Sequence, residues 1–327
     1  MKRNLVIMLF TQAALGAATF CYAQQPIPAN IPSPVKNKME QLSSPDPIKR
    51  ANAACALGAM KSRAVAAIPL LVALLSDGTP IPTQNGCGNA EPFEDESWAP
   101  DIAEIHEPSP GEAATHALMA IGEPGVQALQ RALLASEFWH ARKNAAWGLA
   151  HRGDAIDELI AALKDEAWQV RTQAAYALFQ RGGDEDRVIN ALITASRDEV
   201  KQVRTQAVFA LGHKSSGKVD VVAPLLAALK DEQAEVRIAA AGGLWHCAER
   251  STFAPLFAAL KDPHAGVRKS VANTLGNRAG DEEVQLLIAA RNDPDPNVRE
   301  GVKRALEIIK QRMNGTVTYL RRVPIPN

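Results

Sequence analysis

Residues 165–178 read DEAWQVRTQAAYAL, and residues 198–211 repeat the pattern as DEVKQVRTQAVFAL. Three further segments align with them without gaps, beginning at Asp231, Asp262 and Asp293. In every copy an arginine follows the aspartate by six positions, and a leucine follows the arginine by seven. A pattern that recurs every 31 or 33 residues indicates a repeat architecture, in which each copy is one structural unit stacked on the next.

The repeated charges define a series of matched positions along the chain. Arg50 begins the series, whereas Gly111 stands at one arginine position and Ser136 at one aspartate position. Because the charges recur at one repeat position irrespective of any ligand, we interpret them as structural and expect them to bond between neighbouring units as a ladder. The arginines of the ladder are Arg142, Arg171, Arg204, Arg237, Arg268 and Arg299, and its aspartates are Asp165, Asp198, Asp231, Asp262 and Asp293.

Each unit contains two segments with a helical pattern. In the first, Val170, Ala174 and Leu178 lie on one apolar stripe with the helical period. A break rich in Gly, Asn or charge comes next, and then a second amphipathic segment, such as VVAPLLAALKD at residues 221–231. One such unit cannot bury its apolar face alone. The sequence therefore predicts an all-α solenoid of stacked two-helix repeats, about seven pairs with a cap helix at each end.

The D-x-x-x-x-V-R…A-x-x-A-L pattern covers nearly all of residues 36–313 and resembles the HEAT-like repeats of the phycobilin-lyase type. The resemblance implies a helical solenoid. Proteins with these repeats include bilin lyase subunits, a di-iron deoxyhypusine hydroxylase and many interaction scaffolds, so the resemblance specifies fold better than function. A lyase or lyase-subunit activity resembling the bilin lyases stays open as an alternative, as does a metal-binding or oxidoreductase member of the same family.

The sequence lacks the residues of a recognisable catalytic site. The hydroxylase carries His-Glu directly after the repeat arginine, but in this sequence that place is taken by pairs such as Thr172-Gln173 and Thr205-Gln206, and His106-Glu107 lies outside the register. We therefore exclude the di-iron activity, since a metal site needs ligands that converge at fixed distances. No nucleophile elbow, Gly-rich phosphate loop or paired zinc-ligand spacing is present in the sequence. We expect a non-enzymatic scaffold that binds a protein or peptide partner without a cofactor.

The N-terminus has the three-part pattern of a secretory signal peptide. Lys2 and Arg3 precede a mostly apolar run, and small residues stand before Gln24. The run is shorter than the roughly 20 residues that a membrane span needs. We expect cleavage near Ala23, and a secreted or periplasmic product that does not span a membrane. The expected order is a signal peptide at 1–23, a Pro-rich linker at 24–35, the repeats at 36–313 and a tail at 314–327.

The balance of 36 basic and 36 acidic residues argues against nucleic acid as a partner. The charge is uneven along the chain. An insertion at residues 78–110 carries seven acidic residues and no Lys or Arg, while residues 299–322 carry seven basic and two acidic ones. Long insertions in compact arrays are often functional. The candidate binding residues of the 78–110 insertion are Phe93 and Trp98 as anchors, with Glu94, Asp95 and Glu96 beside them.

Aromatic residues stand two positions before the stripe leucine in three successive repeats, as Trp147, Tyr176 and Phe209. They form either an inner packing column or an exposed groove that binds a peptide. Core packing is the commoner fate of such side chains, and the sequence leaves both interpretations open.

Histidines and cysteines raise two further possibilities. His213, His246 and Cys247 are metal-ligand types in adjacent repeats, but stacked helices lie roughly 8–10 Å apart, so we expect no shared ion. A disulfide between Cys55 and Cys87 is plausible in an exported protein, although the sequence alone cannot fix the pairing.

Overall fold

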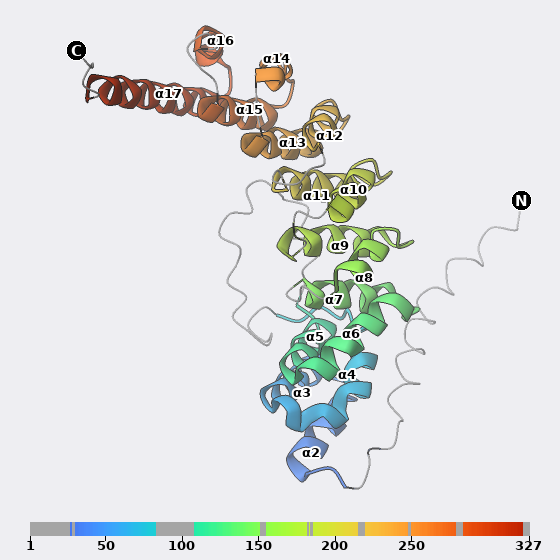
Figure 1. The fold of residues 1–327 in the computed structure, drawn as a ribbon. Helices are drawn as coiled ribbons and strands as arrows, with labels where there is room; N and C mark the ends of the chain where they lie inside the picture. The colour runs from blue at the N-terminus through green and yellow to red at the C-terminus, as the bar shows by residue number, and fades with distance from the viewer. Residues whose placement is uncertain are drawn as a thin grey trace, which may run out of the picture. The chain divides into compact units, whose positions relative to one another are not determined.

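The computed structural model describes residues 27, 30–82, 108–150, 155–181, 183, 186–214, 220–247, 250–278 and 284–322. All regular secondary structure in these ranges is helical. Helix pairs follow one another along the chain, which confirms the predicted all-α solenoid of stacked repeats (Figure 1). Within the same ranges, no helix has the length and apolarity needed to cross a bilayer.

The described helices fall into two compact units that meet in sequence after Arg181. Unit 1 contains α2 (Ser33–Gln41), α3 (Pro47–Ala59), the 3-10 helix η2 (Lys61–Ala67), α4 (Ile68–Leu74), α5 (Pro110–Ile121), α6 (Glu123–Ala135), α7 (Trp139–Leu149), α8 (Ile156–Ala162) and α9 (Trp168–Arg181). Unit 2 contains α10 (Asp186–Ala195), α11 (Lys201–Gly212), α12 (Val222–Ala228), α13 (Ala234–Cys247), α14 (Arg250–Ala259), α15 (Ala265–Arg278), α16 (Val284–Ala289), the 3-10 helix η7 (Ala290–Asn292) and α17 (Pro296–Arg322).

The first helices of successive repeats pack on one another within each unit. In unit 1 these contacts join α3 to α5, α5 to α7 and α7 to α9, and in unit 2 they join α11 to α13, α13 to α15 and α15 to α17 (Figure 1). The stripe leucines lie at these contacts: Leu149 and Leu178 in unit 1, and Leu211 and Leu244 in unit 2, are fully buried. Alanines flank them, for example Ala145. Their small size lets neighbouring helices approach closely.

Glycine permits a close approach between α11 and α13. A Cβ placed on Gly212 would lie 2.2 Å from the Gly243 Cα, and one on Gly243 would lie 3.0 Å from the Gly212 Cα. Real Cβ atoms do not come this near to backbone. The two helices therefore contact each other through their backbones at this point; Gly212 has no room for a Cβ, and one on Gly243 would need α11 to shift by a few tenths of an ångström.

Local capping fixes where the first helices begin. Asp46 accepts a hydrogen bond from the Ile48 N–H at 2.9 Å, and Pro47 occupies the first turn of α3, where its missing N–H costs little. Ser109 accepts from the Glu112 N–H in the same way at the start of α5. These side chains satisfy backbone donors that the helix itself cannot pair.

The C-terminal helix is longer than the sequence suggested. The repeats were expected to end at residue 313, with a tail from 314 to 327, but α17 continues to Arg322. The only helix breaker in that stretch is Gly315, and one interior glycine costs about 1 kcal/mol relative to alanine. That cost is too small to end a helix already nucleated by its contact with α15. Residues 323–327 lie outside the described ranges.

Candidate binding surface

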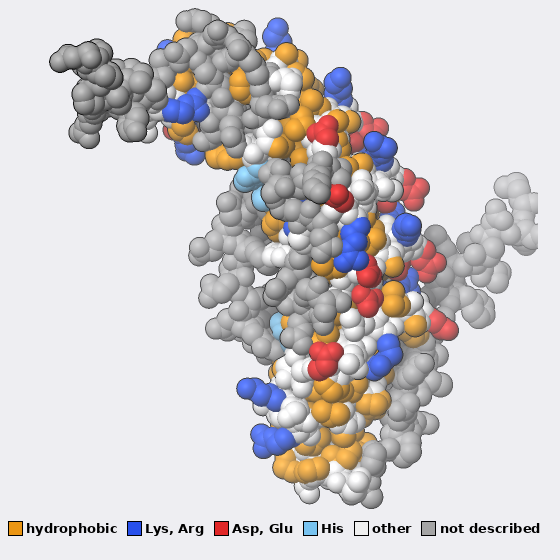
Figure 2. Space-filling view, viewed as in Figure 1, with side chains coloured by type: hydrophobic (Ala, Val, Ile, Leu, Met, Phe, Trp, Pro, Cys, Tyr) orange, Lys and Arg blue, Asp and Glu red, His pale blue; other side chains and the backbone are white. Residues whose placement is uncertain are grey.

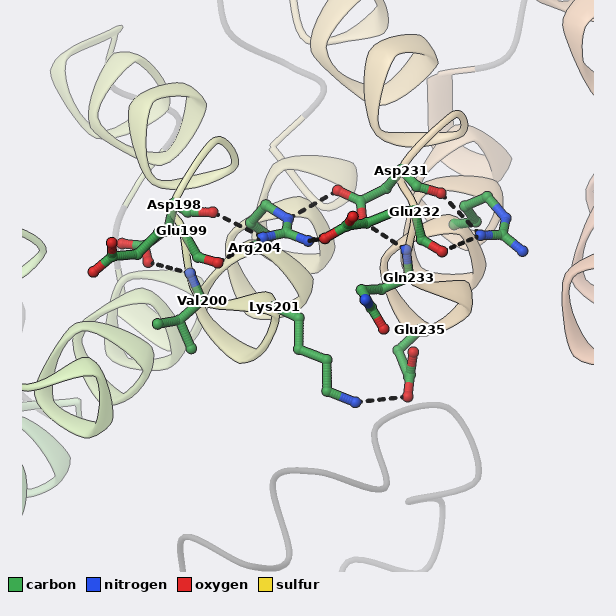
Figure 3. A network of polar contacts seen from close by, with 10 residues as sticks. Asp198, Glu199, Val200, Lys201, Arg204, Asp231, Glu232, Gln233 and Glu235 are labelled. Carbon is green, nitrogen blue, oxygen red and sulfur yellow. Dashed lines mark hydrogen bonds and ion pairs between the residues drawn. The ribbon is translucent and has the colours of Figure 1, made fainter.

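Within each unit the ladder joins neighbouring repeats through a two-sided arginine contact, which Figure 3 shows for unit 2. Arg204 Nη1 donates to the carbonyl oxygens of Asp198 and Glu199, at 2.9 and 3.1 Å, in the loop before its own helix. Its Nε and Nη2 donate to the two carboxylate oxygens of Asp231 in the next repeat, at 2.8 and 3.0 Å. Asp231 in turn accepts from the Gln233 N–H at 2.9 Å. One arginine thus fixes two loops and one helix start.

The same geometry recurs at other repeats of each unit. Both fork contacts join Arg142 to Asp165 in unit 1, and Arg237 to Asp262 and Arg268 to Asp293 in unit 2. Arg171 and Arg299 also donate to the two carbonyls that lie five and six residues before them. Asp198 accepts from the Val200 N–H at 2.8 Å, as the aspartates of the other copies accept from the residue two positions on.

The paired charges shift one another's protonation. The hydrogen bond from Arg268 lowers the pKa of Asp293 more than the burial of the carboxyl raises it. For Asp262, burial is the largest single influence and acts upward, but the contacts from Arg237 and the His264 N–H together bring the pKa below its usual value. The ion pairs are therefore charged at neutral pH, and they serve to hold adjacent repeats in register.

One further pair was missed in the sequence. Arg50 Nε donates to Asp77 Oδ2 at 2.6 Å, and Asp77 Oδ1 accepts from the Thr79 N–H. Asp77 is therefore a ladder aspartate. The insertion hid it, because the next arginine position lies at 111 instead of six residues on. The separation from Arg50, 27 residues, equals that between Arg204 and Asp231 and could have identified it.

The repeat position at Gly111 lacks an arginine for a steric reason. A Cβ there would lie 2.6 Å from Asn144 Nδ2 and 2.7 Å from the Leu75 carbonyl oxygen. Asn144 instead donates to that carbonyl at 2.9 Å, and the Gly111 N–H donates to the Asp77 carbonyl at 2.9 Å. Ser136 occupies the aspartate position of the next repeat, and with glycine at position 111 there is no arginine for it to pair with. The arginine and the aspartate of this ladder pair are thus both replaced.

A backbone hydrogen bond closes the base of the acidic insertion. The Ile81 N–H donates to the Pro108 carbonyl at 2.9 Å, so the chain leaves and returns at one place between α4 and α5. The candidate anchors Phe93 and Trp98, and the acids Glu94, Asp95 and Glu96, lie outside the described residues. Cys55 is disulfide-bonded, and its partner also lies outside them.

The aromatic positions are partly exposed, which excludes a wholly internal packing column. Trp147, Tyr176 and Phe209 all keep some solvent contact, whereas the stripe leucines beside them are fully buried. In unit 1, the Trp147 ring lies edge-on to the His116 ring of the neighbouring first helix, with centroids 4.6 Å apart. Burial raises the pKa of Tyr176, against the effect of the hydrogen bond that its hydroxyl accepts from Gln180. We call Trp147 and Tyr176, which both lie in unit 1, the aromatic row; Phe209 occupies the matching repeat position in unit 2.

Polar side chains on the same first helices lack partners. Gln173 Nε2 in unit 1, and Thr205 Oγ1 and Gln206 Nε2 in unit 2, are buried atoms with no hydrogen-bond partner. They occupy the two positions after the repeat arginine. Burying an amide group without a hydrogen bond costs about 1–3 kcal/mol of folding free energy. The packing of the solenoid therefore does not by itself explain why these polar residues occur here.

The histidine positions lie closer together than the repeat spacing implied. The His213 and His246 ring centroids are 4.8 Å apart, because side chains from helices α11 and α13 reach toward each other across the gap between helix axes. Cys247 Sγ donates to the Gly243 carbonyl at 3.6 Å, within its own helix. In the described part of the chain, no three His, Cys, Asp or Glu side chains converge as a metal site would require.

Charge is interspersed on the face that Figure 2 shows, where acidic and basic side chains of the described residues alternate without forming one large patch of either sign. Lys201 on α11 and Glu235 on α13 are paired at 2.8 Å (Figure 3). The hydrogen bond from Lys201 lowers the pKa of Glu235.

Stacked helix pairs with an inter-repeat ladder define a repeat protein of the α-solenoid class. A family model for HEAT repeats matches residues 126–212 and 222–311, more than half of the chain, and one for the PBS lyase HEAT-like repeat matches residues 49–77. The chain belongs to the HEAT-repeat family. A comparison with the sequences of curated proteins gave no match.

Solved structures show the same fold. YibA of Escherichia coli is 17% identical, with 95% of this chain and 99% of that one covered and a TM-score of 0.57. The karyopherin Kap121p is 17% identical with a TM-score of 0.60, and the similarity covers 85% of this chain and 33% of Kap121p. A second structure of Kap121p, bound to the extreme C-terminus of the protein phosphatase Cdc14p, has a TM-score of 0.61 at 16% identity, with 89% of this chain and 35% of that one covered.

Proposed function

We propose that this chain is an exported, non-enzymatic HEAT-repeat scaffold that binds a protein partner through the aromatic row on its first helices. The observation that carries the proposal is the partial exposure of Trp147 and Tyr176 at one repeat position of unit 1. Rigid aromatic side chains with accessible surface are the residues that contribute most to protein interfaces. A row that served packing alone would be buried like the leucines two positions on.

One further observation supports a polypeptide as the partner. Kap121p, which shares the fold, binds the extreme C-terminus of another protein. The ladder, by contrast, consists of side chains that are already paired with one another, so it stabilises the scaffold and leaves recognition to other residues.

Affinity purification from the exported fraction tests the proposal. The native chain is expected to retain one specific protein, and a variant with Trp147→Ala and Tyr176→Ala is expected to lose it. Leu134→Ala is the matched control, because Leu134 is an apolar residue of the same unit, 58% exposed on the second helix α6. Retention of the same protein by the double variant, at unchanged yield and with an unchanged helical signal, would overturn the assignment of the surface.

A further inference from the structure

The last arginine of the ladder keeps one edge of its guanidinium unpaired. The other ladder arginines of unit 2 use Nη1 for the carbonyls before their own helix, and Nε and Nη2 for the aspartate of the next repeat. Arg299 makes only the first of these contacts: its Nη1 donates to the carbonyls of Asp293 and Pro294, at 2.8 and 2.9 Å. Among the described residues, Nε and Nη2 of Arg299 have no hydrogen-bond partner. The fork is therefore held in the orientation that binds a carboxylate at the earlier repeats.

The apolar cover of the stack also ends at this helix. Leu306 follows Arg299 by seven positions and lies at the stripe position of α17, on the same helix face. The stripe leucines of the earlier repeats, such as Leu275, are fully buried, whereas Leu306 is only partly buried against Val298 and Val302. Leu306 thus keeps apolar surface that a further helix would cover.

The exposed charge around this surface is mainly basic. Residues 296–312 of α17 carry five basic and two acidic residues. Arg299, Lys303 and Arg304 are all exposed, and Glu300 lies 3.9 Å from Lys303. A basic excess favours an acidic partner, because complementary charge speeds the encounter and excludes partners of like charge. We call Arg299, Leu306 and these exposed basic residues the open end of unit 2.

We propose that the open end of unit 2 binds an acidic amphipathic helix of another protein. The Arg299 fork receives a carboxylate at the start of that helix, and Leu306 packs on its apolar stripe. A guanidinium fork suits a carboxylate because two parallel N–H···O bonds fit both groups. The occupant takes the place that the next repeat takes elsewhere, where Asp293 receives Arg268. This surface lies in unit 2 and the aromatic row in unit 1, so either proposal can fail while the other stands.

A second copy of this chain matches the open end less well. Arg50 Nη1 donates to the carbonyls of Ser44 and Pro45, so Ser44 stands at the aspartate position of the first repeat. Its hydroxyl accepts from the Asp46 N–H at 3.2 Å, as the ladder aspartates accept from the residue two positions on. A serine brings no charge to Arg299. Head-to-tail stacking of copies therefore lacks the ion pair that joins other repeats.

A synthetic peptide of residues 231–246 probes the open end of the full chain. This segment contains a ladder aspartate and most of α13, and it carries three acidic residues and one arginine. Fluorescence anisotropy of the labelled peptide should show saturable binding. Arg299→Gln should weaken it by about fivefold or more, as expected for one bidentate charge-assisted pair at a partly exposed site. Arg291→Gln is the matched control, because Arg291 is an exposed arginine of the same unit, and it should leave the affinity within about twofold.

A second peptide, with Asp231→Asn, tests whether Arg299 binds the carboxylate itself. It should bind the native chain about as weakly as the first peptide binds the Arg299→Gln variant, and Arg299→Gln should weaken its binding little further. Circular dichroism shows whether each variant retains its helices. The proposal would be overturned if the first peptide did not bind, or if Arg299→Gln weakened both peptides equally or neither. Sedimentation in which the native chain associates with itself, and the Arg299→Gln variant does not, would overturn it in favour of a second copy.

Discussion

At the residue scale, the ladder combines charge with fork geometry. The side chains of Arg204 and Asp231 are only 11% and 13% exposed, and the pair makes two parallel hydrogen bonds. Removing one member of a largely buried pair leaves the other charge without compensation, which costs more than an exposed ion pair contributes. The stability of the array therefore depends on individual aspartates at one register position.

Asp231→Asn is expected to lower the free energy of unfolding by about 2 kcal/mol, because asparagine can still accept from the Gln233 N–H but loses the charge that Arg204 faces. Glu232→Gln is the control. Glu232 is 78% exposed and lies 3.6 Å from Arg204, so its loss should change stability by less than about 0.5 kcal/mol. Chemical denaturation measures both, and equal effects would contradict the account of the ladder.

The lowered pKa of Asp293 predicts how stability depends on pH. A carboxyl whose pKa is lower in the folded state adds stability above its unfolded pKa, near about 3.9, and that stability is lost as pH falls through the folded value. When the free energy of unfolding is measured between pH 7 and pH 3, the native chain should be more stable than Asp293→Asn at pH 7, and this difference should shrink below about pH 4. A difference that stays constant to pH 3 would show that the carboxylate charge contributes nothing.

At the element scale, backbone contact between first helices determines how tightly the repeats stack. Gly212→Ala would place a methyl group 2.2 Å from the Gly243 Cα, so α11 and α13 would have to separate. We expect a loss of about 2–3 kcal/mol, as for other overpacked sites. Thermal or chemical denaturation measures it.

Gly242→Ala is the matched control for that substitution. Gly242 lies one residue from Gly243 in the same helix, but a Cβ there would meet only Ser270 Oγ, at 3.9 Å. Alanine should therefore be neutral or add up to about 1 kcal/mol through its helix propensity. If both alanine variants behaved alike, the close approach of α11 and α13 would not be what determines their packing.

Most of the fold could be predicted from the repeat, because aspartate, arginine and leucine recur at fixed spacing and a solenoid needs only local order. The features that could not be predicted depend on distances between helices. Gly111 was recognised as a departure from the register, but the backbone that excludes its side chain comes from residues 75–77. The sequence places His213 and His246 in separate repeats, but their rings lie close together in the structure, because the spacing of helix axes does not give the reach of two side chains.

The candidate site was only partly predictable for the same reason. The sequence located Trp147, Tyr176 and Phe209 at one position, but whether such a row is core or surface depends on how closely the neighbouring helices cover it. The structure answers this with partial exposure of all three. The unpaired atoms of Gln173 and Gln206 have no sequence signal, since an amide looks the same whether or not it finds a partner.

At the scale of the whole molecule, part of the neutral total of 36 basic and 36 acidic residues has a structural origin, because arginines and aspartates pair across repeats within each unit. The charge is also uneven: the insertion, whose base is held at Ile81 and Pro108, carries seven acidic residues, and residues 299–322 carry seven basic ones against two acidic ones.

The proposed export of the chain has a direct test in the mass of the mature protein. Residues 1–23 have the pattern of a cleaved signal, so the protein recovered from outside the cytoplasm should begin at Gln24. Intact-mass measurement of that fraction would show the loss of these 23 residues. Recovery of the chain only from the cytoplasm, with its N-terminus intact, would contradict export.

Photo-crosslinking in cells tests the central claim most directly. A photoreactive amino acid replaces Tyr176 on the aromatic row in one strain and the exposed Leu134 on α6 in another. The account predicts that the probe at position 176 forms a covalent adduct with one discrete protein and that the probe at position 134 does not. Adducts of equal yield at both positions, or none at 176 while the chain remains folded, would contradict the assignment of the row as the partner-binding surface.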